Sequence, residues 1–431
     1  MRTFECGHAA SKRPPSRSPL TALVTDDPWL AALEAFRTRN PRRHDRIAAY
    51  ERLLAAGHHL EVGARVIAAD HQPAPPVEAW LNKADGRKKR VFQYPPLDEL
   101  LFRTVNRLLQ PVAAEEASPW CRSFLPGGGA RSAFRRVLSD PAVAAKGALR
   151  LDVRDYFNSV DPADLLAELP TPFAGHPVRP LLAAALLDRR VVRHGAVVDG
   201  GRKGIMAGTP LAPLLATLYL RDLDGEVAGR ATYARYSDDI LVLAPPADLP
   251  GLESLVRARL AARGLDVNER KSALTAPGQP WDFLGFRHHE GAVGLAPHTE
   301  HKLRARTTRL ARSLLRWRER TGAGTERTVR AFVRRVNLRL YGVRTERAEF
   351  SWTTWFLPLL DRPDGLEALD AHVQREARYA ATGRRTDRAR RLVPYEALTE
   401  AGLLPLVSAY WALRLDPEGY DRLVVRRTGV G

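Results

Sequence analysis

The spacing of hydrophobic and polar positions changes along this chain of 431 residues and divides it into three regions. The first begins with helical spacing in DDPWLAALEAFRTR, residues 26–39, where acidic residues precede the apolar positions. In the same region, residues 87–111 predict a short strand, a Pro-Pro break and a helix. From residue 148 the segments ALRLDV, RRVVRHGAVV, YARYSDD and DILVLA are typical of strands. After residue 290 the spacing is helical, so the sequence predicts an α+β fold.

Changes in composition place the boundaries between these regions. Residues 1–28 are rich in Pro, Ser and Arg, and we expect them to form a disordered basic tail. A mixed region at 29–147, a sheet region at 148–290, a basic helical region at 291–345 and a helical end at 346–431 follow. In the helical end, the residues expected in the core are Tyr395, Leu398, Leu403, Leu406, Tyr410 and Trp411.

Three features of the whole chain indicate its compartment. No run approaches roughly 18 uninterrupted apolar residues, so no membrane span is predicted. The N-terminus has no apolar stretch of signal-peptide length. The two cysteines, Cys6 and Cys121, are too few for a disulfide framework. We therefore expect a cytoplasmic protein that has no membrane partner.

The charge balance indicates a polyanionic partner. Lys and Arg number 67 against 49 acidic residues, a formal net charge of +18, and arginine is well shaped for bidentate contact with phosphate. Between Lys302 and Arg344 there are 14 basic and two acidic residues. Charge runs are commonly solvated faces, but a net +12 at helical spacing favours a cradle for nucleic acid. The candidate contacts are Arg304, Arg309, Arg312, Arg316, Arg334 and Arg335.

An aspartate lies at the end of the first strand of the sheet region. Alternation puts Leu149, Leu151 and Val153 on one face, so Asp152 projects from the opposite face as a presented carboxylate. A strand-end aspartate can also cap a following helix. We expect Asp155 to cap the helix that starts there.

A carboxylate pair, Asp238 and Asp239, separates two strand-like runs in YARYSDDILVLA. Polar residues between strands commonly form a solvated turn, which is one interpretation of the pair. The other is chemical, because these residues and Asp152 could together hold two divalent ions in the arrangement used for nucleotidyl transfer. Mg²⁺ suits such oxygen ligands, and Mn²⁺ is an alternative.

The segment GIMAGTPLAPLLATLYL, residues 204–220, predicts a turn that enters a buried helix. Gly208, Pro210 and Pro213 mark the turn, and the leucines that follow have the spacing of a buried face. A glycine in such a turn allows close approach to a nucleotide or a base pair. The GxxxxGK[ST] pattern of a phosphate-binding loop is absent.

In this order, the segments resemble the prokaryotic reverse transcriptases over residues 85–290. LDVRDYF is similar to the first palm motif of that family, which implies that Asp152 binds metal and that Phe157 checks the ribose. YSDD resembles the YxDD box, which implies Asp238 as a metal ligand and Asp239 as its acidic neighbour. The resemblance therefore implies catalysis by three aspartates with two Mg²⁺ ions.

Three further motifs extend the resemblance. GLDVNERKS is similar to the next palm motif and implies a nucleotide-binding role for Lys271. WDFLGF, at 281–286, resembles the primer-grip motif. RKKRVFQYPP is similar to the fingers motif, where Arg90 would meet the triphosphate and Lys88 is the alternative. The implied fold is a right-hand polymerase with fingers at 29–147, a palm at 148–290 that has part of the fingers inserted, a thumb at 291–345 and a helical C-terminal extension.

One turn departs from the family pattern. The usual Pro-Gln-Gly before the buried helix is replaced by Met206, Ala207 and Gly208. The retained Gly208 implies an intact nucleotide-binding turn. Loss of the glutamine, which normally lies against the incoming nucleotide and the template, puts fidelity or template dependence in doubt.

The absence of several segments narrows the choice among the subtypes of reverse transcriptase. No nuclease-like segment follows the palm, and the VTG and NAxxH boxes of retron enzymes and the SQ turn of diversity-generating elements are missing. The organisation resembles the unknown-group bacterial enzymes, several of which are linked to antiphage defence and a structured noncoding RNA. We expect an RNA-directed DNA polymerase that copies a dedicated noncoding RNA into DNA from dNTPs. The alternatives are a group II intron-type maturase and a template-independent, protein-primed polymerase.

Overall fold

The computed structural model describes residues 18–82, 88–121, 123–342 and 351–428. These form two compact units. The first comprises the described residues up to Gly128, with Val153–Glu226 and Val256–Val267. The second comprises Gly129–Asp152, Val227–Leu255 and the described residues from Asn268 onward. Among the helices described, none has the length and apolar character needed to cross a bilayer.

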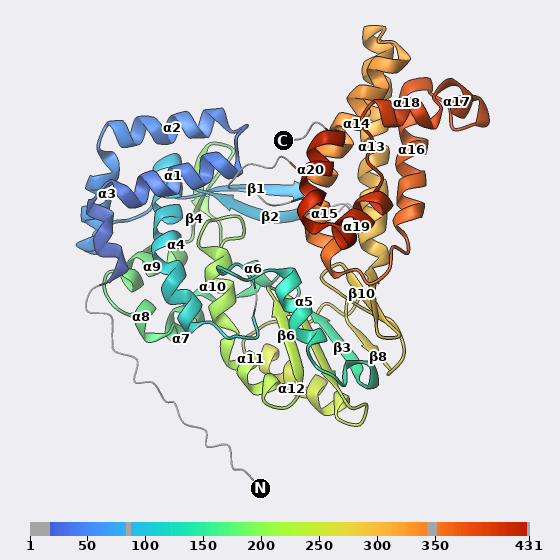
Figure 1. Cartoon of the computed structure of the whole chain (residues 1–431). Helices are drawn as coiled ribbons and strands as arrows, with labels where there is room; N and C mark the ends of the chain where they lie inside the picture. The colour runs from blue at the N-terminus through green and yellow to red at the C-terminus, as the bar shows by residue number, and fades with distance from the viewer. Residues whose placement is uncertain (1–17, 83–87, 122, 343–350, 429–431) are drawn as a thin grey trace. The chain divides into compact units, whose positions relative to one another are not determined.

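The first unit contains a mostly helical layer and a four-stranded sheet (Figure 1). Its elements in chain order are η1 (Pro19–Val24), α1 (Asp27–Arg39), α2 (His44–Ala55), α3 (His58–Ile67), β1 (Val77–Asn82), β2 (Lys88–Gln93), α4 (Pro96–Glu116), α6 (Tyr156–Ser159), α7 (Pro162–Glu168), α8 (Thr171–Ala174), α9 (Val178–Leu187), β4 (Arg190–Arg193), β5 (Ala196–Asp199) and α10 (Ala212–Tyr219). Two helices contribute residues to both units: α11 (Arg221–Ala228) and α12 (Leu249–Ala261).

The start of the described chain is folded, which corrects part of the predicted tail. The side-chain oxygen of Ser18 accepts a hydrogen bond from Leu20 N and caps η1, and Leu20 and Leu23 are fully buried. The indole of Trp29 donates to the carbonyl oxygen of Leu23 at 3.0 Å. The disorder expected up to residue 28 is therefore wrong from residue 18 on, because the apolar side chains there find a core. Residues 1–17 lie outside the described residues.

The sheet of the first unit has the strand order β2-β1-β4-β5. β1 and β2 are antiparallel, with Trp80 opposite Arg90, while β1 pairs with β4 in parallel. The next segment agrees with the predicted strand, Pro-Pro break and helix, since β2 is followed by α4 after Pro95. Similarly, the predicted strand at 189–198 is the hairpin β4–β5.

The second unit contains two sheets and a helical body. Its elements are α5 (Ala130–Leu138), η2 (Val143–Ala145), β3 (Gly147–Asp152), β6 (Thr232–Tyr236), β7 (Asp239–Ala244), β8 (Ala273–Thr275), β9 (Trp281–Phe283), β10 (Phe286–His289), β11 (Ala292–Leu295), α13 (Pro297–Thr321), α14 (Thr325–Tyr341), α15 (Trp352–Phe356), η3 (Leu357–Leu359), α16 (Leu366–Thr382), α17 (Asp387–Leu392), α18 (Tyr395–Glu400), α19 (Leu406–Leu415) and α20 (Pro417–Thr428). The larger sheet has the antiparallel order β6-β7-β3-β8, and the smaller one has the order β11-β10-β9. The fold is a mixture of helix and sheet, as predicted.

The helices predicted as thumb and as C-terminal extension share one hydrophobic core. Helices α13, α14 and α16 lie side by side (Figure 1), and their buried faces meet those of α18, α19 and α20. The carboxylate of Asp370 on α16 accepts hydrogen bonds from Leu406 N and Val407 N at the start of α19. Of the expected core residues in this region, Tyr395 and Trp411 are exposed, at 42% and 48%, so for these two the prediction is wrong.

Candidate active site

Antiparallel pairing places two of the predicted aspartates opposite each other. Asp152 ends β3 and Asp239 begins β7, and the two are register partners. Asp238 precedes β7 in the tight turn after β6, where Ser237 has a positive φ of 60°. The fully buried Arg235 donates a hydrogen bond from Nη1 to the carbonyl oxygen of Ser237 at 3.2 Å. The three carboxylates therefore gather at one end of the larger sheet.

Asp152 is buried and hydrogen-bonded, whereas the sequence predicted a presented carboxylate. Its exposed fraction is only 3%. Lys271 Nζ donates to Oδ2 at 2.5 Å, and Asn268 Nδ2 donates to Oδ1 at 2.9 Å. Asn268 N also donates to the carbonyl oxygen of Asp152 at 2.7 Å. Sequence reasoning did not select Asn268, although it lies three residues before Lys271 in the same motif.

The closeness of the carboxylates shows in their pKa values. Burial, followed by repulsion from Asp238 and Asp152, raises the pKa of Asp239 to about 7. Burial and the charge of Asp152 also raise the pKa of Asp238. Burial opposes the charge on Lys271, but its hydrogen bond to Asp152 and the three carboxylates together raise its pKa. Burial and the neighbouring carboxylates thus both disfavour the charged form of Asp239.

The aspartates suit a divalent cation in charge and in ligand type, since Mg²⁺ and Mn²⁺ bind carboxylate oxygens. They are not already gathered as ligands of one ion. Within the described ranges, no three His, Cys, Asp or Glu side chains form a metal-binding group. Asp152 is not arranged as a metal ligand because its two carboxylate oxygens accept hydrogen bonds, Oδ1 from Asn268 and Oδ2 from Lys271.

Two acidic residues that follow Asp152 in the sequence have other partners. Asp155 occupies the cap position of α6, but its side chain makes no capping bond, which corrects the prediction. Its carboxylate accepts from Asn158 Nδ2 at 3.0 Å instead. Asp161 caps α7 by accepting from Ala163 N at 2.8 Å.

A cavity of about 590 Å³ in the second unit reaches Asp239. It is lined by Arg150, Asp239, Arg270, Lys271, Leu284, Gly285, His298, Thr299, Lys302, Arg306 and Phe356. Arg150 lies two residues before Asp152 on the same strand face, and its guanidinium donates to the carbonyl oxygen of Lys271 at 2.9 Å. Strand alternation could therefore have identified Arg150 from the sequence. The cavity combines the Asp239 carboxylate with several cations and an apolar wall.

The predicted nucleotide-binding residues Arg90, Phe157 and Gly208 all belong to the first unit. Arg90 is occupied structurally: its guanidinium donates to the Glu78 carboxylate and to the carbonyl oxygens of Gly200 and Arg202, each at 2.8 Å. Strand alternation turns Lys89 to the other face of β2. Lys89 Nζ lies 5.3 Å from the centre of the Phe157 ring. The geometry thus brings Lys89, and not Arg90, beside the aromatic ring.

The turn that contains Gly208 is packed against β2. Phe92 N donates to the carbonyl oxygen of Ala207 at 2.8 Å. Gly208 has φ +98°, and a Cβ there would lie 3.1 Å from the carbonyl oxygen of Phe92. Both Met206 and Ala207 are buried, and the Tyr94 hydroxyl donates to Met206 Sδ at 3.4 Å. The glycine is therefore required by the backbone, while the two residues before it face protein.

The basic residues of α13 form one exposed band. Lys302, Arg306, Arg309, Arg312, Arg316 and Arg320 recur at helical spacing and are all exposed. Arg339 on α14 has its pKa lowered by burial and by the charges of Arg306 and Arg309. Arg334 and Arg335 are exposed on α14. Arg304 lies outside this band, on the flank where His372 Nε2 contacts its carbonyl oxygen at 3.2 Å.

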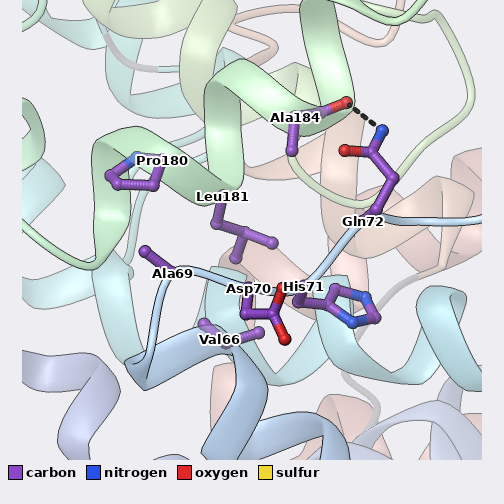
Figure 2. A pocket seen from close by; sticks show the side chains of 8 residues that line it. All are labelled: Val66, Ala69, Asp70, His71, Gln72, Pro180, Leu181 and Ala184. Atoms are coloured by element: carbon purple, nitrogen blue, oxygen red, sulfur yellow. Dashed lines mark hydrogen bonds between the residues drawn. The ribbon is translucent and has the colours of Figure 1, made fainter.

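A smaller cavity of about 160 Å³ lies in the first unit (Figure 2). Its lining residues are Val66, Ala69, Asp70, His71, Gln72, Pro180, Leu181 and Ala184. Gln72 Nε2 donates to the carbonyl oxygen of Ala184, and His71 Nε2 pairs with Asp98 Oδ1 at 2.8 Å. None of the residues predicted from sequence lines this cavity, and its polar side chains Gln72 and His71 are engaged by Ala184 and Asp98.

Residues 83–288 match the family model described as reverse transcriptase (RNA-dependent DNA polymerase). These residues form a reverse transcriptase domain. Among curated proteins it is similar to the retron Mx65 reverse transcriptase of Myxococcus xanthus, with 27% identity over 322 residues, covering 66% of this chain and 73% of that protein. It is thus related to the prokaryotic retron enzymes, although its sequence contains neither the VTG box nor the NAxxH box.

The family assignment gives the enzyme its reaction. This reverse transcriptase is an RNA-directed DNA polymerase, which implies an RNA template, dNTP substrates and a DNA product. The matched residues include the three aspartates, Phe157 and Lys271. The band on α13 lies beyond the matched residues.

Proposed function

We propose that this reverse transcriptase catalyses two-metal nucleotidyl transfer with Asp152, Asp238 and Asp239. The observation that carries the proposal is the cluster of carboxylates at one sheet end, where repulsion contributes to the raised pKa of Asp239. Divalent ions relieve such repulsion, and they would activate the primer 3′-hydroxyl and neutralise the leaving pyrophosphate. Asp152 and Asp238 would supply the main ligands, with Asp239 as their acidic neighbour.

Lys271 serves in this proposal as the counter-ion of Asp152 before substrate binds. Its side chain is 53% exposed and lines the cavity, so it can turn toward a triphosphate. Asn268 would keep Asp152 in position through its bonds to the carboxylate and the backbone. The resemblance that implied nucleotide binding by Lys271 is consistent with this arrangement.

On the first unit, we assign ribose discrimination to Phe157 and a triphosphate contact to Lys89. Phe157 is tied to the turn before α10, since its carbonyl oxygen accepts from Ile205 N at 2.8 Å. Lys89 replaces Arg90 in this role because the Arg90 guanidinium is bound to Glu78. The backbone at Gly208 would allow the nucleotide to approach closely.

The right-hand arrangement of fingers, palm and thumb is part of the same proposal. The basic band of α13 would hold the phosphates of the template–product duplex, since Lys302 and Arg306 line the cavity that contains Asp239. Arg309, Arg312 and Arg316 continue the band, and Arg334, Arg335 and Arg339 add positive charge on α14. Arg304 is removed from the predicted contacts.

We propose further that the template is a dedicated structured noncoding RNA and that synthesis serves antiphage defence. Two features support this: the similarity to a retron reverse transcriptase, and a strongly basic helical body that a structured RNA could contact. A template-independent polymerase is the second candidate. It is favoured by one observation, the buried Ala207 at the position where the family has a glutamine.

The test is to isolate the full chain from its native locus and to sequence the RNA and DNA that accompany it. The control is the double variant Asp238→Asn/Asp239→Asn, which keeps the side-chain shapes but removes the charges. The proposal expects one specific RNA with both proteins and complementary DNA with the wild type alone. DNA unrelated to the RNA would favour the template-independent candidate, and complementary DNA from the double variant would overturn the catalytic assignment.

A further inference from the structure

The segment from Ser351 to Asp361 attaches the C-terminal helices to the cavity that contains Asp239. It comprises α15 and η3, and its first turn is fixed by a capping box between Ser351 and Thr354. The fully buried Thr353 hydroxyl donates to the carbonyl oxygen of Leu340 at 3.0 Å and accepts from the Tyr420 hydroxyl at 3.0 Å. α15 is therefore held firmly by α14 and α20.

The other end of this segment is bonded to the smaller sheet. Asp361 N donates to the carbonyl oxygen of Val293 at 2.9 Å, and Val293 N donates to Asp361 Oδ2 at 2.7 Å. The Tyr410 hydroxyl adds a bond to the carbonyl oxygen of Asp361 at 2.8 Å. These two bonds between Val293 and Asp361 join strand β11 to the segment that leads into the C-terminal helices.

Between these two attachments, Phe356 packs onto the turn of the primer-grip motif. Its ring lies 5.2 Å from that of Phe286 and 5.0 Å from that of Trp352, measured between centroids. A Cβ on Gly285, which has φ +95°, would lie 3.0 Å from Phe356 Cε1. Thr299 Oγ1 donates to the carbonyl oxygen of Gly285 at 2.9 Å. The turn is thus held between Thr299 and Phe356.

Phe356 also lines the cavity itself, together with Asp239, Lys302 and Arg306. A primer nucleotide has an anionic phosphate and an apolar sugar and base. The cavity offers a matching pair of surfaces, cations for the phosphate and an aromatic ring for the sugar and base.

We propose that Phe356 is a positioning residue that contacts the terminal nucleotides of the primer strand and holds them against the turn at Gly285. The C-terminal helices thereby supply part of the polymerisation site and are more than an RNA-binding appendage. The inference rests on the proposed function, because it takes this cavity as the place where the primer ends.

The test compares Phe356→Ala with Trp411→Ala, a change of an exposed aromatic residue on α19. Two affinities are measured by fluorescence anisotropy in the absence of dNTPs: that for a DNA primer annealed to an RNA template, and that for the RNA template alone. Phe356→Ala should weaken hybrid binding about tenfold and leave binding of the RNA alone unchanged. Trp411→Ala should change neither affinity.

Unchanged hybrid binding in Phe356→Ala, or an equal loss for hybrid and RNA alone, would overturn the proposal. If thermal melting shows that Phe356→Ala is unfolded, Phe356→Leu retains the apolar packing on Phe286 and is judged by the same criterion. Failure of the proposed function would give a different result: the wild-type protein would bind the hybrid but incorporate no dNTP. The two outcomes are therefore distinguishable.

Discussion

Lys271 Nζ lies 2.5 Å from Oδ2 of Asp152, a residue 119 positions earlier in the chain. The pair places a side-chain cation where the proposed mechanism requires a divalent ion. Asp239 adds a further carboxylate opposite Asp152 in the sheet. Lys271 thus balances the charge of a buried carboxylate, and several consequences can be measured.

Removing the lysine charge should make the fold more dependent on divalent ions. Among the described residues, Lys271→Met leaves Asn268 as the remaining side-chain donor to the buried Asp152, and we expect a loss of about 1 kcal/mol in EDTA. Mg²⁺ should restore most of it, because an ion that binds the native state stabilises it. Thermal melts should therefore show a larger Mg²⁺-induced rise in Tm than in wild type. Lys271→Arg is the matched control, and an identical rise in all three proteins would contradict the prediction.

The pKa of Asp239 predicts a pH dependence of stability. Because the folded pKa is about 7 and the ordinary value is 3.8, the native state holds a proton that the unfolded state has lost between these values. Stability in EDTA should therefore fall as pH rises through this window. Asp239→Asn removes the titration, so its Tm should exceed that of wild type above pH 7. Parallel Tm-versus-pH curves for the two proteins would refute this.

Substitutions of Lys89 and Arg90 should have different effects, the first on nucleotide binding and the second on stability. Arg90→Ala removes bonds to Glu78, Gly200 and Arg202, and urea unfolding should show a loss of about 1–3 kcal/mol. Lys89→Ala should leave stability nearly unchanged and raise the KM for dNTPs. The reverse pattern, a KM effect of Arg90→Ala alone, would restore the assignment made from the sequence.

Phe157 should control the choice between deoxyribose and ribose. Phe157→Val or Phe157→Ala opens space at the position where the resemblance places the 2′-hydroxyl, so ribonucleotides should be accepted more readily. We expect the ratio of kcat/KM for dNTP over rNTP to fall about tenfold or more. Steady-state incorporation with matched nucleotides measures this ratio. An unaltered ratio would remove Phe157 from the ribose gate.

The band on α13 should dominate the salt dependence of nucleic-acid binding. Each lost phosphate contact should lower the slope of log affinity against log salt by about one. Arg306→Ala and Arg309→Ala are expected to do so, whereas Arg304→Ala, on the same helix but outside the band, should not. If Arg306→Ala and Arg309→Ala both kept the wild-type slope, the band would not contact the backbone of the nucleic acid.

Local patterns allowed much of this architecture to be predicted from the sequence. Alternation identified β3 and the β6–β7 hairpin, and helical spacing identified α13 together with most of its charged face. These features depend on neighbours in sequence and on burial of one face. The residues of the basic band could have been predicted more accurately by following the helical spacing from Lys302 to Arg320.

Contacts between distant residues could not be predicted in this way. Nothing near Arg90 in sequence shows that Glu78 binds it, since the pair forms only when β1 and β2 align. The burial of Asp152 likewise depends on Asn268 and Lys271, more than a hundred residues away. Tyr395 and Trp411 have helical spacing typical of a core, yet the neighbouring leucines fill it and leave both rings in solvent.

The reciprocal bonds between Asp361 and Val293 bear on how this enzyme could be shortened for use as a tool. A minimal polymerase cut after α14 would keep every family motif, yet Val293 on the edge strand β11 would lose both of its bonds to Asp361. Exposed strand edges of that kind promote aggregation. Useful truncations would therefore have to retain the chain at least through Asp361, and grafting of foreign C-terminal modules should begin beyond that residue.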